Sequence, residues 1–124
     1  LPSLPRTRVA LVGLYRDEET FTPVEYYQKW PVRMERPRVL VLDPMLATGG
    51  SLAVTLDLLK GRGVTDARVL CLVAAPEGVA HLERTHPGVE IFTAALDQGL
   101  NERQYIVPGL GDAGDRLMGT GDQV

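Results

Sequence analysis

Four small or hydroxyl-bearing residues, Thr48 to Ser51, form a Thr-Gly-Gly-Ser turn within the stretch VLVLDPMLATGGS, residues 39–51. The two glycines would let the backbone approach an anion without obstruction by a Cβ atom, and the two hydroxyl groups could donate further hydrogen bonds. If a helix begins at Ser51, the free N–H groups of its first turn also favour negative charge. The turn therefore predicts either a phosphate site or, equally well, a plain helix start with an N-cap serine.

The acidic residue before this turn indicates which phosphate-bearing group it could hold. Asp43 follows the apolar run Val39 to Leu42, so its carboxylate is expected at the carboxyl end of a strand, where open parallel sheets bind ligands. There it could accept hydrogen bonds from sugar hydroxyls while the turn holds a 5′-phosphate, which favours a phosphoribosyl group. In the alternative, Asp43 only satisfies nearby backbone donors. The stretch lacks the lysine of a P-loop and the spacing of a dinucleotide fingerprint, which argues against ATP and NAD.

Alternating apolar runs and helical patterns must position these residues. Three runs rich in valine and leucine are typical of strands buried on both faces, and a fourth is weaker. Helices are expected between them, one closed by Gly61 and Gly63 and one begun by Pro76. This alternation predicts an α/β fold, with a parallel sheet covered on both faces and joined by right-handed crossovers. The expected strands are 9–14, 39–42, 69–74 and 89–95, and the expected helices are 51–61 and 76–86.

Two stretches fall outside this rhythm. Residues 16–31 carry Tyr26, Tyr27 and Trp30 and are expected to form an extended arm or hairpin. Their aromatic side chains are expected to cover an edge of the core or a subunit contact, in preference to touching a ligand. The segment from residue 98 onward has a glycine every few residues and no sustained period, which is typical of a functional loop.

Composition restricts the classes of function. The 124 residues are expected to form a single domain, 1–124. With 13 basic against 16 acidic residues the chain has no electrostatic footprint for nucleic acid or a membrane surface, so a small-molecule partner is expected. No apolar stretch reaches the roughly 20 residues that span a bilayer and the first residues lack signal-peptide features, so a cytoplasmic location is expected. Cys71 is expected to be buried, and His81 and His86 to face solvent or cap their helix, since the sequence pairs neither histidine with an acid.

Four blocks of the sequence together carry a resemblance to a known family. VLVLDPMLATGGS resembles the phosphoribosyl-pyrophosphate loop of type I phosphoribosyltransferases, in particular that of the uracil phosphoribosyltransferases, where Asp-Pro replaces the usual acidic pair. GLYRDEET at 13–20, VAAPEG at 73–78 and YIVPGLGDAGDR at 105–116 are similar to the same family. The similarity runs from Val9 to Thr120. It implies a twisted parallel sheet flanked by helices, of the type I phosphoribosyltransferase kind, without the N-terminal elements that family members have.

The resemblance also implies the roles of individual residues. Arg16 matches an arginine that contacts phosphoribosyl pyrophosphate, and Asp43 and Asp112 are the two residues expected to take part in the chemistry. The residues expected to bind phosphoribosyl pyrophosphate are Arg16, Asp43, Pro44, Met45, Leu46, Ala47, Thr48, Gly49, Gly50, Ser51 and Asp112. Those expected to bind uracil, within a loop region at 98–120, are Ile106, Gly111, Asp112 and Ala113. Backbone groups suit this base because it presents two carbonyls and an N–H on one edge.

The implied reaction transfers the phosphoribosyl group of phosphoribosyl pyrophosphate to uracil, giving UMP and pyrophosphate in pyrimidine salvage. Mg²⁺ is the implied cofactor, held on the pyrophosphate rather than by a protein site. The implied partners are the two substrates, further copies of the chain in a homodimer or higher homo-oligomer, and GTP, which is an effector in some relatives. The alternatives are a non-catalytic phosphoribosyl-binding, nucleotide-binding or assembly module that kept the fold, and a nucleic-acid regulator, which the net charge of −3 disfavours.

Two departures from the family pattern bear on these expectations. Family members are longer, with an N-terminal half that carries a second arginine-bearing loop for the pyrophosphate, so poor turnover is expected of the 124 residues alone. Gln104 stands where a glycine usually precedes the tyrosine, and it is expected to reshape the entry to the uracil loop. Both ligand loops are nevertheless complete in sequence, which favours an enzyme over a module that has lost its chemistry.

Overall fold

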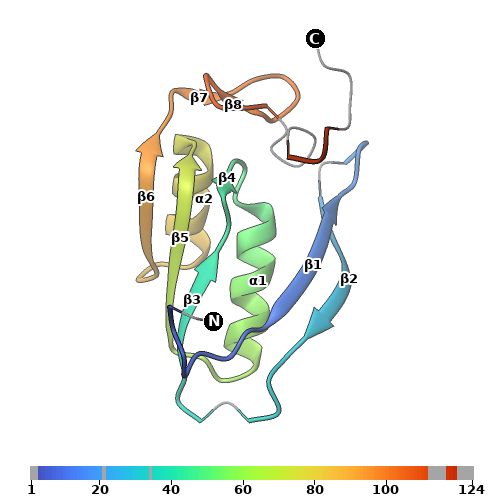
Figure 1. The fold of residues 1–124 in the computed structure, drawn as a ribbon. Coiled ribbons are helices and arrows are strands. Elements are labelled where there is room, and N and C mark those ends of the chain that lie inside the picture. The colour runs from blue at the N-terminus through green and yellow to red at the C-terminus, as the bar shows by residue number, and fades with distance from the viewer. Residues whose placement is uncertain (1–2, 21, 34, 112–116, 120–124) are drawn as a thin grey trace.

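The computed structural model describes residues 3–20, 22–33, 35–111 and 117–119 (Figure 1). Strands and helices alternate from β3 to β6, with a strand pair on either side of this central part. Asp112, Ala113 and the side chain of Tyr26 lie outside what the structure describes. The elements are β1 (Leu11–Arg16), β2 (Pro23–Lys29), β3 (Arg38–Leu42), β4 (Met45–Leu46), α1 (Gly50–Gly61), β5 (Asp66–Ala74), α2 (Pro76–Thr85), β6 (Glu90–Leu96), β7 (Gly99–Leu100) and β8 (Ile106–Val107).

The central sheet is parallel, with β5 between β6 on one side and both β3 and β4 on the other. β3 and β4 are two parts of one strand, because Leu42 lies opposite Leu70 and Met45 opposite Val73 without a change of register. The interruption falls at Pro44, which has no backbone N–H to donate. The strand that was expected at 39–42 therefore continues past residue 42, and the glycine turn (residues 48–51) begins only after β4.

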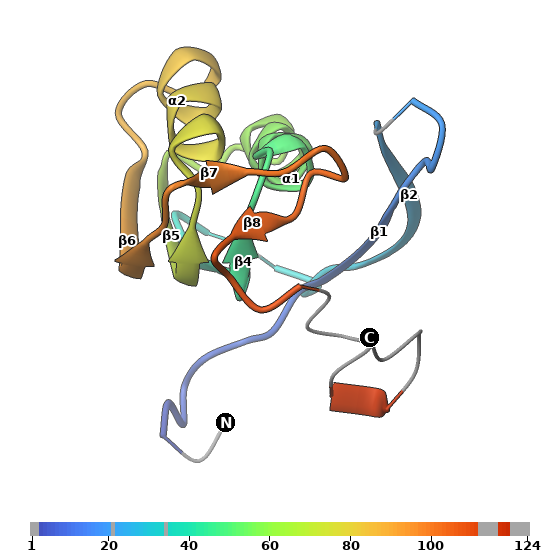
Figure 2. The ribbon, with the colours of Figure 1, turned by 90° about the horizontal axis from the view of Figure 1, so that it is seen from above.

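Both helices cover the same face of this sheet (Figure 2). The crossovers from β4 to β5 and from β5 to β6 run in one direction across the sheet, and crossovers of one hand then place their helices on one side. The expectation of a sheet covered on both faces is therefore wrong for the residues that the structure describes. The core lies between the helices and the inner face, and it contains Val41, Leu46, Leu52, Ala53, Leu56, Leu59, Val64, Val69, Cys71, Ala74 and Leu82.

The outer face of the sheet carries large apolar side chains that the described residues leave in solvent. They alternate along the strands with the core residues, as side chains on a strand must. Each is 45% to 68% exposed: Leu40, Leu42, Leu70, Leu72, Phe92 and Leu96. The strands that were expected to be buried on both faces are therefore buried on one face only. The expectation that Cys71 is buried is confirmed. No helix in the described part of the chain is long and apolar enough to cross a bilayer.

β1 and β2 form a separate antiparallel hairpin beside α1. The apolar run at 9–14 was expected to form a strand buried on both faces, and this is wrong, because β1 pairs only with the neighbouring β2 among the described strands and has no buried residue. Asp17 shapes the connection: its carboxylate accepts hydrogen bonds from the amides of Thr20 and Glu19, which lower the pKa of Asp17. The tight turn explains how the arm at 16–31 folds back on β1.

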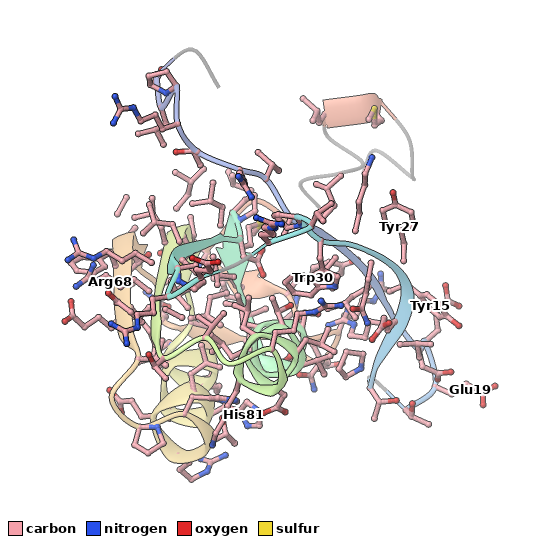
Figure 3. The ribbon with its side chains drawn as sticks, turned by 90° about the horizontal axis from the view of Figure 1, so that it is seen from below. Tyr15, Glu19, Tyr27, Trp30, Arg68 and His81 are labelled. Atoms are coloured by element: carbon pink, nitrogen blue, oxygen red, sulfur yellow. The ribbon has the colours of Figure 1, made fainter. Side chains whose placement is uncertain are left out.

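The aromatic residues of the hairpin divide into two groups (Figure 3). Trp30 packs against the core, and the guanidinium of Arg62 lies 4.3 Å from its ring centroid. Tyr15 and Tyr27 are exposed on the hairpin. Trp30 therefore covers an edge of the core, which is one of the two roles expected of these aromatics.

His86 joins the two helices at their far ends. It follows the last residue of α2, its backbone N–H donates to Leu82, and its side chain is 8% exposed. Its Nε2 lies 2.8 Å from a carboxylate oxygen of Asp57 on α1, and its Nδ1 lies 2.9 Å from the hydroxyl of Thr85. The expected capping role is therefore found, but the expectation that no acid meets this histidine is wrong, because the acid is 29 residues away in sequence.

Candidate functional site

The glycine turn connects the end of β4 to the start of α1. Gly49 is the N-cap residue and has a φ of +85°, which favours glycine, so Ser51 lies inside the helix and is not the N-cap that the sequence predicted. The amide of Gly50 donates to the hydroxyl of Thr48 at 3.3 Å. None of the described residues accepts a hydrogen bond from the amides of Thr48, Gly49 or Ser51. These donors at a helix N-terminus are therefore available to an anion.

Helix α2 supports this turn from behind through Gly78. A Cβ atom on Gly78 would lie 2.4 Å from the carbonyl oxygen of Ala47, so only glycine permits this approach. A Cβ atom on Gly49 would in turn lie 3.0 Å from the carbonyl oxygen of Gly78 and 3.2 Å from the ring of His81. Gly78 was given no role from the sequence, and the only signal that included it was the VAAPEG block at 73–78.

Asp43 sits at the interruption between β3 and β4. Burial raises the pKa of its carboxyl above the ordinary value of 3.8, and a hydrogen bond from the amide of Met45 opposes that shift. The bond is long, at 3.3 Å, so the capping role considered for Asp43 satisfies its carboxylate only weakly. A ligand that donates to this carboxylate would therefore relieve an unfavourable burial.

Part of the expected ligand set lines one cavity of about 190 Å³, namely Arg16, Met45, Ala47, Ile106 and Gly111, whereas Asp43 and the glycine turn are not among its lining residues. β7 and β8 lie across the carboxyl ends of the central strands (Figure 2), and Ile106 of β8 lines the cavity. The cavity is lined by Arg16, Met45, Ala47, Gln104, Tyr105, Ile106 and Gly111. Arg16 also donates to the carbonyl oxygen of Arg103 at 3.4 Å, which ties the hairpin to the segment before β8. Three separate parts of the chain thus meet where their sequence blocks predicted a shared ligand.

The remaining expected residues of the loop take different positions. Leu46 is buried in the core and its carbonyl accepts a hydrogen bond from Ala75, so its side chain does not face this cavity. Pro44 is exposed, and its carbonyl accepts hydrogen bonds from Leu72 and Val73. Both residues therefore serve the sheet in the structure.

A second, more open cavity of about 390 Å³, which was not predicted from the sequence, borders the glycine turn at Thr48. Its walls come from the glycine turn, from α2 and from the segment that follows β7. They are Thr48, Glu77, His81, Arg84, Leu100, Asn101 and Gln104. Gln104 is the residue common to both cavities.

Gln104 has a φ of +66°, a left-handed conformation that is strained for any residue with a Cβ atom. Its amide donates to Asn101, whose side chain accepts hydrogen bonds from Arg103 and Tyr105, so the turn is held from several sides. We expect Gln104→Gly to raise the free energy of unfolding by about 1 kcal/mol, because glycine adopts this conformation without strain. Urea denaturation measures the change.

The control for this prediction is Gln104→Ala, which shortens the side chain but keeps the strain. Its free energy of unfolding is expected to stay within about 0.5 kcal/mol of that of the parent chain. A Gln104→Gly chain that unfolds more easily than the parent would show that the side chain stabilises the turn more than its backbone strains it.

Comparison with known proteins gives three results. A family model described as uracil phosphoribosyltransferase matches residues 1–120. The solved structure of the AQ2163 protein from Aquifex aeolicus is similar to this chain with 40% identity and a TM-score of 0.84, over 94% of this chain and 55% of that one. Adenine phosphoribosyltransferase from Leishmania donovani is similar in fold, with 16% identity and a TM-score of 0.51, over 97% of this chain and 57% of that one. The predicted fold class is confirmed, and the chain spans 55% of the length of the first of these structures.

Proposed function

Because the chain belongs to the uracil phosphoribosyltransferase family, we propose that it transfers the phosphoribosyl group of phosphoribosyl pyrophosphate to uracil, giving UMP and pyrophosphate. The observation that carries this proposal is the cavity of about 190 Å³, which Arg16, Ala47 and Gly111 line together from three parts of the chain. An arginine and a loop of main-chain groups at this cavity, together with the available amides that directly follow Ala47 in the chain, suit a charged sugar phosphate next to a flat polar base.

In this proposal the sugar phosphate is held by the stretch from Asp43 to Ser51. The amides of Thr48, Gly49 and Ser51 would bind the 5′-phosphate, and the carboxylate of Asp43 would accept hydrogen bonds from the ribose hydroxyls. Arg16 would hold the pyrophosphate, because a guanidinium offers paired donors to phosphate oxygens. Each of these groups binds or orients phosphoribosyl pyrophosphate without forming a covalent bond to it.

The base is proposed to lie against the loop from Ile106 to Ala113, which includes Asp112 and residues beyond those described. Main-chain donors and acceptors would fix the base below C1 of the ribose. The reacting carbon gains positive charge as the pyrophosphate leaves, and the carboxylates proposed for this chemistry, those of Asp43 and Asp112, would stabilise that charge. No covalent nucleophile is required.

Magnesium fits this arrangement as a companion of the substrate. The described residues contain no group of three or more metal-binding side chains, whereas Mg²⁺ is commonly held by one or two carboxylates together with substrate phosphate oxygens. The ion would be carried by the pyrophosphate and would neutralise its charge as it leaves. The proposal also includes the homo-oligomer and the GTP effector that the family resemblance implies.

Conversion of labelled uracil to UMP in the presence of phosphoribosyl pyrophosphate and Mg²⁺ tests the proposal. We expect UMP to form, and Arg16→Ala to lower kcat/KM by about 10- to 100-fold, because a charge-assisted phosphate contact is lost. Arg38→Ala is the matched control and should leave kcat/KM unchanged, since its side chain is exposed on β3 and, among the described residues, pairs only with Asp66. No UMP formation together with no uracil binding would refute the proposal.

One observation favours a second candidate, a phosphoribosyl-binding module without turnover. The chain spans 55% of the length of its solved relative with 40% identity, so parts of an active site can lie beyond what the two share. This candidate predicts that phosphoribosyl pyrophosphate binds and that Arg16→Ala weakens this binding, while no UMP forms. The same two assays therefore separate the two functions.

A further inference from the structure

Asp97 is anchored at the point where the central sheet meets the β7–β8 pair. It directly follows β6, and its amide donates to the carbonyl oxygen of Ala74, the last residue of β5, at 2.8 Å. The next amide, that of Gln98, donates to the carbonyl oxygen of Val107 in β8 at 3.0 Å. The backbone at this point is therefore fixed to the sheet on one side and to β8 on the other.

The carboxylate of Asp97 reaches across to the loop at 106–111. Its Oδ2 accepts a hydrogen bond of 3.0 Å from the amide of Gly109, and the bond is partly buried. Gly109 has a φ of +44°, and a Cβ atom there would lie 2.1 Å from the carbonyl oxygen of Ile106. The loop is thus tightly folded, in a backbone conformation at Gly109 that favours glycine. The amide of Gly109 points out of the loop, toward the carboxylate of Asp97.

The two ends of this loop belong to the candidate site. Ile106 and Gly111 both line the cavity of about 190 Å³, and Gly109 lies between them in sequence. Asp97 itself lines neither cavity. Any effect of Asp97 on a ligand must therefore pass through the position of the loop.

We propose that Asp97 is a positioning residue that sets the affinity for the base by fixing the loop at 106–111 through the amide of Gly109. This inference rests on the proposed function, since it takes uracil as the base. Neither the sequence blocks nor their spacing single out this residue.

Two substitutions of Asp97 and one control test the proposal in the UMP assay. Asp97→Ala removes the acceptor, and we expect the KM for uracil to rise about 10-fold while the KM for phosphoribosyl pyrophosphate changes less than about twofold. Asp97→Asn keeps an oxygen that can accept from Gly109, so it should restore most of the loss. Glu90→Gln is the control, because Glu90 lies at the other end of β6 and its one ion pair within the described part of the chain is with Arg68 at the surface.

The chemical shift of the Gly109 amide proton supplies a readout that does not depend on activity. It should move upfield in Asp97→Ala, where the hydrogen bond is lost, and stay near its original position in Glu90→Gln. An unchanged Gly109 shift overturns the positioning role. So does an unchanged KM for uracil in a chain that makes UMP, or an equal rise in both KM values, which would indicate general damage. A parent chain that makes no UMP refutes the proposed function, and the Gly109 shift then still decides whether Asp97 fixes the loop.

Discussion

Replacing Asp43 by Asn is expected to lower UMP formation by about 100-fold and, at the same time, to make the chain harder to unfold at neutral pH. Activity falls because the amide offers one acceptor oxygen in place of a charged pair, and hydrogen bonds to charged groups are the stronger ones. Stability rises because burial raises the pKa of the Asp43 carboxyl, which means that the folded chain disfavours its ionised form. Opposite changes in activity and stability are typical of a residue retained for binding.

The pH dependence of this stability gain gives a strict test. Below the ordinary pKa of 3.8 the carboxyl is protonated in both the folded and the unfolded chain, so ionisation contributes nothing to stability there. As the pH rises above 3.8, the unfolded chain ionises first and the parent chain loses stability until the raised folded pKa is passed. Urea denaturation of the parent and of Asp43→Asn should therefore show a gap that opens from acidic to neutral pH. A gap that is constant over this range would contradict the role given to burial.

Replacing Gly78 by Ala is expected to cost about 2 to 3 kcal/mol of the free energy of unfolding and to abolish binding of ribose 5-phosphate. The new methyl group would meet the carbonyl oxygen of Ala47 at 2.4 Å and a methyl group of Leu46 at 2.9 Å, and a backbone atom cannot move aside cheaply. Relief of this clash must displace the glycine turn from α2. Thermal unfolding measures the first effect and titration calorimetry the second.

Gly61→Ala is the matched control for this substitution. Gly61 is the last residue of α1, and a Cβ atom there would meet nothing within 4 Å. Alanine is the better helix former, so this change should leave stability unchanged or raise it by up to about 1 kcal/mol. Unaltered unfolding and phosphate binding in Gly78→Ala would show that the turn does not depend on its contact with α2.

The strands and helices of the central part were predictable because their hydrophobic patterns are local. The runs at 39–42, 69–74 and 89–95 correspond to β3, β5 and β6, and both helices lie within one or two residues of their expected ranges. The apolar run at 9–14 was misassigned because apolar character alone does not reveal which strand will pair with it. The sequence also did not predict that both helices cover the same face of the sheet, because this depends on the spatial order of the strands.

The candidate site was predictable to the extent that its chemistry lies in single stretches of sequence. The glycine turn and Asp43 lie where a phosphate and a sugar could be held, although the helix start differs because a left-handed Gly49 takes the N-cap position. The supporting residues were not found, because each acts across a long separation in sequence. Gly78 supports the turn from the next helix, and Asp97 holds a loop twelve residues later.

The two helices are fastened to each other at both ends, by the pair of His86 and Asp57 at one end and by the contact of Gly49 with Gly78 at the other. These two contacts hold the helices in a fixed arrangement, so the amides of the glycine turn need little rearrangement when an anion binds. Binding then costs little conformational entropy, so more of the intrinsic attraction between the phosphate and the helix start remains as affinity. Loosening the distant histidine brace would weaken phosphate binding without altering a single group that touches the ligand.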